Sequence, residues 1–300
     1  MTTVSVITPT YNRAETLPRA IESVLAQDHE EIEHVIVDDG STDDTPAVVA
    51  EYDDDRIEYR RLEDNVGANA ARNAGIRAAS GEYVAFLDSD DEFYPGKLGA
   101  CVDALESLPE RYGGVFHGYD IYRGETYLGP EATAEGRVTL ADLGEANVPG
   151  SFVATAFRRE VFDAVGELDE AMAASQDYEF YLRVAREYDL YGLGAVLARH
   201  YRQPDSISLD LDARRAGKAQ LVERHGDVLT DRRHAHHHYL LGLAHAKRDE
   251  LGPARRELVR AIRLHPTNPF PYVHLVTCVT PTTFALGTAA KRRVKRLLGR

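Results

Sequence analysis

Two acidic clusters stand directly after short apolar runs in the first third of the chain. Asp38-Asp39 follows one run, and Asp88-Ser89-Asp90-Asp91 follows another. Carboxylates two residues apart, such as Asp88 and Asp90, can face one ligand. Their hard oxygens suit Mg²⁺ or Mn²⁺, with a diphosphate completing the coordination. A cation there would neutralise the charge of a leaving diphosphate. A solvated acidic loop or a helix cap remains the competing interpretation.

Two other polar side chains occupy similar positions. A carboxylate at Asp39 can accept a hydrogen bond from a base or a ribose hydroxyl. Tyr11 follows the first apolar run, where its ring can stack on a nucleobase. Helix capping around Ser41 and an ordinary turn tyrosine are the structural alternatives.

The elements that must hold these residues alternate between strand and helix. β-branched or apolar runs predict strands at 4–8, 34–37, 56–60 and 83–87, and helical spacing predicts helices from about 14 and over 68–79. Such alternation predicts a mostly parallel sheet with helices on both faces. Ligands gather at the carboxyl ends of parallel strands, so both acidic clusters are expected on one edge of the sheet.

The second half of the chain has a different pattern. Short strands with glycine-rich turns are predicted from about residue 112, followed by a strand at 152–157, a short helix at 158–165, a helix at 177–188 and a strand at 195–201. From about residue 210 the pattern is helical, with a helix pair over 231–266 whose small residues allow close approach. We therefore predict an α/β sheet domain followed by a helical extension.

Four segments in order resemble the signature of family 2 glycosyltransferases. They are Val6-Ile7-Thr8-Pro9-Thr10-Tyr11-Asn12-Arg13, Val37-Asp38-Asp39-Gly40-Ser41-Thr42-Asp43, Asn73-Ala74-Gly75 and Phe86-Leu87-Asp88-Ser89-Asp90-Asp91. The resemblance covers about residues 3–205. It implies the GT-A fold and an inverting transfer from a nucleotide-sugar, with Mn²⁺ or Mg²⁺ as cofactor.

The resemblance also implies roles for individual residues. The expected donor-binding residues are Pro9, Tyr11, Asp39, Arg72, Asp88 and Ser89. Tyr11 would stack on the base, Asp39 would hydrogen-bond it, and Arg72 would reach the base or the phosphates. Asp90 would ligate the metal.

The catalytic base is expected at the start of a helix in the second half. In this family an aspartate from a Glu-Asp pair usually removes the acceptor proton. The matching residue here is Asp177, and the preceding glutamate is replaced by Gln176. Glu179 is the reserve candidate. A helix cap is the structural alternative for Asp177.

The resemblance divides the chain into three predicted parts. Residues 1–112 would bind the donor, residues 113–208 would bind the acceptor, and residues 209–300 would form a helical extension with a basic tail. The tail contains six basic and no acidic residues, beside a moderately apolar segment. This composition predicts peripheral contact with an anionic membrane, with packing on the protein's own acidic surface as the alternative.

Composition limits the remaining classes of function. The formal charge of −14 argues against nonspecific nucleic-acid binding. Only five basic residues are lysines, which suits a haloarchaeal protein or an ordinary acidic one from a GC-rich genome. Two distant cysteines and no recognisable secretory signal favour the cytoplasm, on or near the inner membrane face.

Several alternatives remain open at this stage. Glycine-rich dinucleotide and phosphate-loop motifs are absent, which argues against nucleotide-dependent oxidoreductases and P-loop enzymes. A noncatalytic nucleotide- or sugar-binding protein, or a scaffold on the same fold, is still compatible with the sequence. The donor is expected to be a UDP- or GDP-sugar. The acceptor is expected to be a lipid-linked glycan in N-glycosylation or surface polysaccharide assembly.

Overall fold

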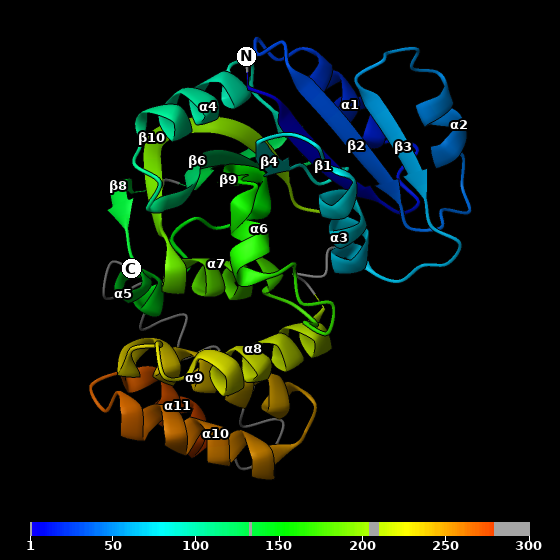
Figure 1. The fold of residues 1–300 in the computed structure, drawn as a ribbon. Helices are drawn as coiled ribbons and strands as arrows, with labels where there is room; N and C mark the ends of the chain where they lie inside the picture. Colours follow the sequence, from blue (N-terminus) through cyan, green and yellow to red (C-terminus); the bar gives the residue numbers. More distant parts are fainter. Residues whose placement is uncertain (1, 132–133, 204–209, 279–300) are drawn as a thin grey trace. The chain divides into compact units, whose positions relative to one another are not determined.

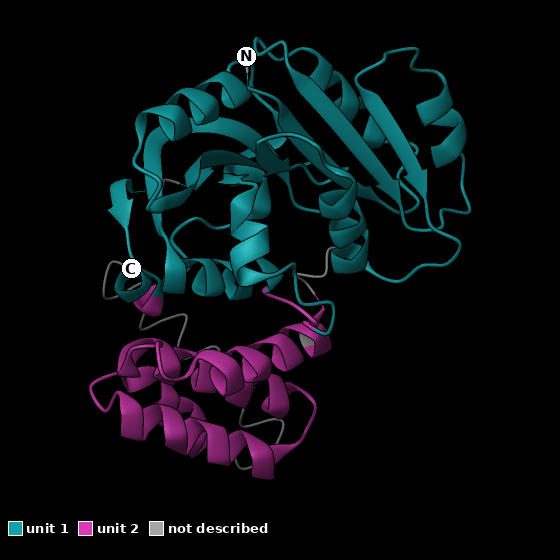
Figure 2. Ribbon diagram, in the orientation of Figure 1, with its two compact units in different colours: residues 1–143, 147–171, 176–204 teal, residues 144–146, 172–175, 205–300 magenta. Residues whose placement is uncertain are grey.

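The computed structural model describes residues 2–131, 134–203 and 210–278. These residues form two compact units (Figure 2). The first contains the described residues up to 203, except 144–146 and 172–175. Those two short segments and residues 210–278 make the second unit.

The first unit is built on one mixed sheet (Figure 1). Its strands are β1 (Val4–Thr10), β2 (Ile32–Asp38), β3 (Ile57–Arg61), β4 (Tyr83–Phe86), β5 (Glu92–Phe93), β6 (Tyr112–Arg123), β7 (Thr126–Glu131), β8 (Glu135–Val138), β9 (Thr155–Arg158) and β10 (Asp189–Tyr201). The order along the sheet is β3-β2-β1-β4-β9-β6-β10-β5, with β7 beside β6 and β8 beside β10. Strands β1 to β4 are parallel, and β9 runs antiparallel to its neighbours β4 and β6. The parallel pairing predicted from strand–helix alternation is confirmed for β1 to β4. The complete sheet is mixed, because β9, β7, β8 and β5 join it in antiparallel pairs, and the predicted α/β fold class is confirmed.

Helices lie on both faces of this sheet. The helices of residues 2–187 are α1 (Leu17–Leu25), α2 (Thr45–Ala50), α3 (Ala68–Ala78), α4 (Lys97–Ser107), α5 (Leu140–Glu145), α6 (Glu160–Val165) and α7 (Gln176–Glu187), of which α5 runs from the first unit into the second. Successive residues of β2 show the two-sided burial. Ile36 packs with Leu17 of α1, whereas Val35 and Val37 pack with Ala71 of α3. Neighbouring side chains of a strand point to opposite faces, so the continuous apolar run buries both of them.

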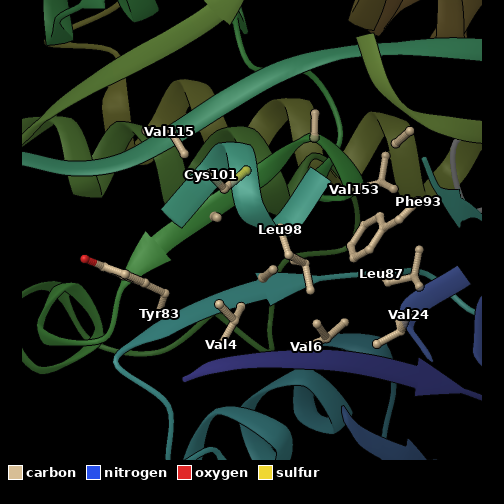
Figure 3. Packing of buried hydrophobic residues seen from close by; sticks show 14 of the residues in the cluster. Val4, Val6, Val24, Tyr83, Leu87, Phe93, Leu98, Cys101, Val115 and Val153 are labelled. Carbon is tan, nitrogen blue, oxygen red and sulfur yellow. The ribbon is translucent and has the colours of Figure 1, made fainter. Parts of the chain in front are cut away.

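The largest core cluster fixes the strands that end at the acidic residues. Figure 3 shows Val4 and Val6 of β1 in one buried cluster with Leu98 of α4 and with Leu87, which follows β4. Leu98 and Val6 are completely buried. This packing holds the ends of β1 and β4 in a fixed register, which sets the position of the loops beyond them.

The strand predicted at 152–157 is only partly correct. Phe152–Ala154 forms a 3₁₀ turn (η1), and strand β9 begins at Thr155. The turn directs the Phe152 ring into an aromatic core, where its centroid lies 5.0 Å from that of Phe86 and 5.6 Å from that of Tyr181. Burial of an aromatic ring therefore outweighs the strand preference of this apolar run.

The second unit is helical, with α8 (Leu211–His225), α9 (Asp231–Lys247), α10 (Leu251–Leu264) and α11 (Pro269–Thr277). The predicted helix pair is confirmed as α9 and α10. A Cβ added at Gly242 would lie 2.9 Å from the Leu258 side chain, and Ala254 and Ala261 are completely buried. Small residues thus permit the close approach of these two helices. None of the described helices is long and apolar enough to cross a bilayer. The basic tail and most of the apolar segment before it lie outside the described residues.

Burial of His34 in β2 predicts an acid-sensitive sheet. Burial, with a smaller contribution from the charge of Arg56, lowers the pKa of His34 to about 3. The unfolded chain binds this proton near pH 6.5. The stability contributed by the neutral ring is therefore complete above pH 6.5 and is lost as the pH falls toward 3. The free energy of unfolding should therefore fall with decreasing pH in this window. We expect His34→Gln to reduce the slope of the free energy of unfolding against pH by about 1.4 kcal/mol per pH unit.

Urea unfolding between pH 5 and 7, followed by tyrosine fluorescence, measures this dependence. The exposed His236 supplies the matched control, and His236→Gln should leave the slope unchanged. If His34→Gln had the same slope as the unsubstituted chain, the acid sensitivity would not come from the burial of His34.

Candidate active site

The two acidic clusters lie at the same edge of the sheet, as predicted. Asp38 ends β2 and pairs with Thr10 at the end of β1, while Phe86 of β4 pairs with Ile7 on the other side of β1. All three strands are parallel, so the loops after them emerge together. These loops carry Tyr11, Asp39 and the segment 88–91.

The loop after β1 is tied to the loop after β2. The Asn12 backbone N–H donates to Ser41 Oγ over 2.9 Å, and Asn12 Oδ1 accepts from the Thr42 backbone N–H over 2.8 Å. Asn12 adopts φ +51°, a conformation that asparagine tolerates better than most residues. These contacts fix the turn that presents Tyr11, whose side chain is 41% exposed. An exposed ring on a fixed turn offers a stacking surface. Pro9, in contrast, is buried within β1.

Asp39 is engaged by the chain itself. Its two carboxylate oxygens accept the backbone N–H groups of Val66 and Gly67, each over 2.8 Å. The turn at Gly40 (φ +75°) brings the segment so close that an added Cβ would lie 3.0 Å from the backbone of Asp64. Asp39 therefore shapes the loop that precedes α3, in addition to any contact it makes with a ligand.

Arg72 and Asp88 form an ion pair. The Arg72 Nη2 donates to Asp88 Oδ1 over 2.5 Å, and the guanidinium carbon lies 5.3 Å from the centroid of the Phe152 ring. The side chain of Arg72 is 10% exposed, and that of Asp88 is 27% exposed. A largely buried guanidinium with a fixed orientation can donate to a phosphate oxygen without a large cost in side-chain entropy. Ser89 beside it is buried.

Asp90 and Asp91 lie where negative charge is concentrated. Burial, followed by the charges of Asp91 and Asp88, raises the pKa of Asp90 to about 7. Asp91 is completely buried, and burial also raises the pKa of its carboxyl group. Like charges in a buried cluster oppose ionisation, so this edge of the sheet favours a cation.

His200 on β10 is the main residue of this edge that sequence reasoning missed. Its Nδ1 lies 2.9 Å from Asp91 Oδ2, and the Tyr201 backbone N–H donates to Asp91 Oδ1 over 2.9 Å. Burial alone would lower the pKa of His200, but the charge of Asp91 and this hydrogen bond outweigh burial and raise it to about 9. The late strand was predicted, but nothing in the sequence indicates which of its residues reaches Asp91, 109 positions earlier.

The residues fit a divalent cation that shares its coordination with a diphosphate. Across residues 2–131, 134–203 and 210–278, no group of three or more His, Cys, Asp or Glu side chains is arranged to hold a metal ion. Mg²⁺ in particular commonly uses one or two carboxylates together with substrate phosphates and waters. Asp88 is paired with Arg72, and Asp91 with His200. Asp90 is thus the carboxylate best able to supply a ligand.

The predicted base, Asp177, lies in the first turn of α7. Its Oδ1 accepts the Tyr178 backbone N–H over 2.6 Å. Burial first, and then the charge of Asp177, raises the pKa of the fully buried Tyr181, while the charge of Arg72 lowers it. Tyr181 lies one turn after Asp177 on α7, and the Phe152 ring lies 5.6 Å from the Tyr181 ring and 5.3 Å from the Arg72 guanidinium carbon, so Phe152 links this helix to the Arg72 side chain.

Glu179 is less suited to the role of base. Its carboxylate is 4% exposed and binds the Arg183 Nε over 3.0 Å and 3.1 Å. A carboxylate that is withdrawn from solvent and already bound by a guanidinium is less accessible to an acceptor hydroxyl than one at the start of the helix.

Comparison with known proteins gives consistent matches. Residues 5–166 match the profile described as glycosyl transferase family 2. A relative from Bacillus subtilis, named for teichuronic acid biosynthesis, is 34% identical over 211 residues, covering 68% of this chain and 81% of that protein. A Campylobacter jejuni relative, GalNAc(5)-diNAcBac-PP-undecaprenol beta-1,3-glucosyltransferase, is 41% identical over 161 residues, covering 51% of this chain and 50% of its own length. The chain spans 54% and 31% of two other curated relatives.

Solved structures share the fold at low sequence identity. TarS residues 1–349 from S. aureus, in complex with UDP-GlcNAc, superimpose with a TM-score of 0.65 at 18% identity, covering 97% of this chain and 92% of TarS. The mannosyltransferase PcManGT from Pyrobaculum calidifontis, in complex with GDP-Man and Mn²⁺, gives a TM-score of 0.60 at 20% identity, covering 95% and 86%. The GT-A-type sheet is therefore the fold of this chain.

Proposed function

This chain belongs to glycosyl transferase family 2, and from this premise we propose that it transfers a sugar from a UDP- or GDP-sugar to a hydroxyl group with inversion at the anomeric carbon. The single observation that carries this proposal is the cluster of three carboxylates at Asp88, Asp90 and Asp91, of which Asp91 is completely buried, within the same unit as Asp177. A cation-attracting edge suits a diphosphate leaving group, and a separate carboxylate suits a base on the opposite side of the sugar.

In the proposed mechanism, each residue of the site has one task. Tyr11 stacks on the base of the donor, in a pocket to which Pro9, Asp39 and Ser89 contribute. Arg72, oriented by Asp88, donates to the donor nucleotide. Asp90 holds Mn²⁺ or Mg²⁺, which when bound neutralises charge on the departing diphosphate. Asp177 accepts the proton of the acceptor hydroxyl as that oxygen attacks the anomeric carbon.

We further propose that residues 1–112 form the donor half of the site and residues 113–208 the acceptor half. The residues assigned to the nucleotide and the metal all precede Asp91, whereas Asp177 follows it. Names of the relatives support a lipid-linked glycan as acceptor, in surface polysaccharide or protein glycan assembly. Such an acceptor suits a protein on the inner face of the membrane, with the basic tail as a contact.

Five lysines among 35 basic residues and the charge of −14 support a haloarchaeal source. Activity that rises with salt concentration is the test of this proposal.

Release of nucleoside diphosphate from a panel of UDP-, GDP- and dTDP-sugars tests the proposed function. We expect release from one donor with Mn²⁺ or Mg²⁺, and loss of release with EDTA. If no donor is turned over, calorimetric titration of UDP and GDP with metal is the deciding measurement. Absence of metal-dependent nucleotide binding would favour a noncatalytic scaffold on this fold.

Stacking by Tyr11 predicts a graded effect of substitution on donor binding. Stacking of one base on an aromatic side chain contributes about 1–3 kcal/mol. We therefore expect Tyr11→Ala to weaken nucleotide binding by roughly tenfold or more, while Tyr11→Trp retains it. Calorimetric Kd values for the nucleotide are the measurement. Equal weakening by both substitutions would show that the ring does not stack.

A further inference from the structure

An arginine-rich face lies on helix α10 of the second unit, among residues that the proposed catalytic site does not use. Arg255, Arg256, Arg260 and Arg263 surround Val259 and line an open hollow of about 370 Å³. All four arginines are exposed. Arg256, Arg260 and Arg263 are spaced four and three residues apart, which places them along one side of the helix, and Arg255 precedes Arg256 directly (orange in Figure 1).

Much of the positive charge on this face is not neutralised within its own unit. Arg260 pairs with Glu257 over 3.0 Å, and Arg255 donates to the Cys278 carbonyl oxygen over 2.7 Å. The side chains of Arg256 and Arg263 make no hydrogen bond or ion pair with any residue that the structure describes. A second hollow, between α8 and α9, also contains basic residues, but there Arg215 pairs with Glu250 over 3.3 Å.

The distribution of charge along the sequence indicates the kind of partner. Residues 210–278 contain 12 Lys or Arg against 8 Asp or Glu, and residues 279–300 add six basic and no acidic side chains. The tail therefore brings no negative charge that could neutralise the arginine face. Residues 1–209 carry a net charge of −24. An anionic surface would attract the C-terminal part of the chain and repel the rest.

Apolar groups in the same unit favour a lipid surface over a soluble polyanion. Val259 lies among the arginines, and α11 exposes Tyr272 (41%) and Val276 (75%). Helix α11 ends beside α10, where Arg255 binds the Cys278 carbonyl oxygen. Guanidinium groups bind phosphate, and neighbouring apolar and aromatic side chains enter the interface between headgroups and acyl chains.

We propose that the arginine face of α10 docks the helical unit on a bilayer of anionic phospholipid, with Arg256 and Arg263 binding headgroup phosphates. This docking goes beyond sugar transfer and does not depend on it. It also differs from membrane contact through the tail, because the residues that bind the headgroups lie on α10.

Cosedimentation of the full-length chain with vesicles tests the proposal. The vesicles contain either phosphatidylglycerol with phosphatidylcholine or phosphatidylcholine alone. We expect the chain to bind only the anionic vesicles, and binding to weaken as salt increases. Each basic residue near such a surface strengthens binding about fivefold. The variant Arg256→Glu/Arg263→Glu should therefore bind at least about 25-fold more weakly.

The matched control has the same change in net charge at other exposed arginines. Arg123→Glu/Arg232→Glu should bind the anionic vesicles within about threefold of the unsubstituted chain, since generalised electrostatic attraction alone is weak at a distance. The proposal is overturned if the two double variants lose binding equally, if neither loses it, or if the unsubstituted chain binds neither kind of vesicle. Binding of duplex DNA in preference to anionic vesicles would also overturn it. Circular dichroism establishes that both variants remain folded.

Discussion

Replacement of Asp177 by asparagine is expected to lower turnover by roughly 10²–10⁴-fold while leaving nucleotide binding unchanged. A positioned general base contributes about this factor. Asparagine keeps the size of the side chain and its capacity to accept the Tyr178 backbone N–H, but it cannot take the acceptor proton. The measurement is the rate of nucleoside-diphosphate release in the presence of acceptor, together with the calorimetric Kd for the donor nucleotide.

Two control variants sharpen the interpretation of Asp177→Asn. Asp163→Asn changes an exposed carboxylate of α6 and should leave turnover unaffected. Glu179→Gln breaks the ion pair with Arg183 and should reduce stability more than it reduces turnover per folded molecule. Turnover by Asp177→Asn close to that of the unsubstituted chain would refute its role as base and would require another proton acceptor.

Asp90→Asn is expected to lower turnover and, in the absence of metal, to raise the free energy of unfolding. If Asp90 holds the metal as proposed, its loss removes several kcal/mol of stabilisation of charge in the transition state. Turnover should therefore fall by a factor on the order of 10²–10³ or more, and nucleotide binding should lose its dependence on Mn²⁺ or Mg²⁺.

The same substitution is expected to stabilise the protein without metal. Burial and the charges of Asp91 and Asp88 raise the pKa of Asp90 to about 7. A raised pKa means that the neutral carboxyl group is favoured in the folded state, so the stability it contributes is lost as the pH rises from 3.8 to about 7. Asparagine cannot ionise, so it removes this loss of stability. At pH 8 in EDTA we expect the free energy of unfolding to increase by about 1–3 kcal/mol.

Urea unfolding at pH 8 and at pH 5 measures this effect, and the gain should be much smaller at pH 5. Asp103→Asn, at an exposed position of α4, is the control and should change neither stability nor turnover. A destabilised Asp90→Asn protein would show that the carboxylate is held by favourable contacts and not by a repulsive cluster.

The amino-acid sequence by itself determined the sheet and the edge at which the site lies. Continuous apolar runs such as Val35–Val37 predict strands buried on both faces, and helical spacing between them predicts parallel pairing. Parallel strands end at one edge, so the positions of Asp39 and Asp90 follow from local pattern alone. The helix pair in the C-terminal part could be predicted for a similar reason, because its small residues have helical spacing.

Only the tertiary structure decided which polar groups are paired. Asp39 receives two backbone N–H groups from residues 66–67, and Asp91 binds His200 from β10. The turn at Phe152 likewise follows from the aromatic core that its ring enters. Such partners lie far apart in the chain and have no periodic signal. Their contacts and the shifts in pKa depend on burial and on distances of a few ångströms, which are set only when strands and helices pack together.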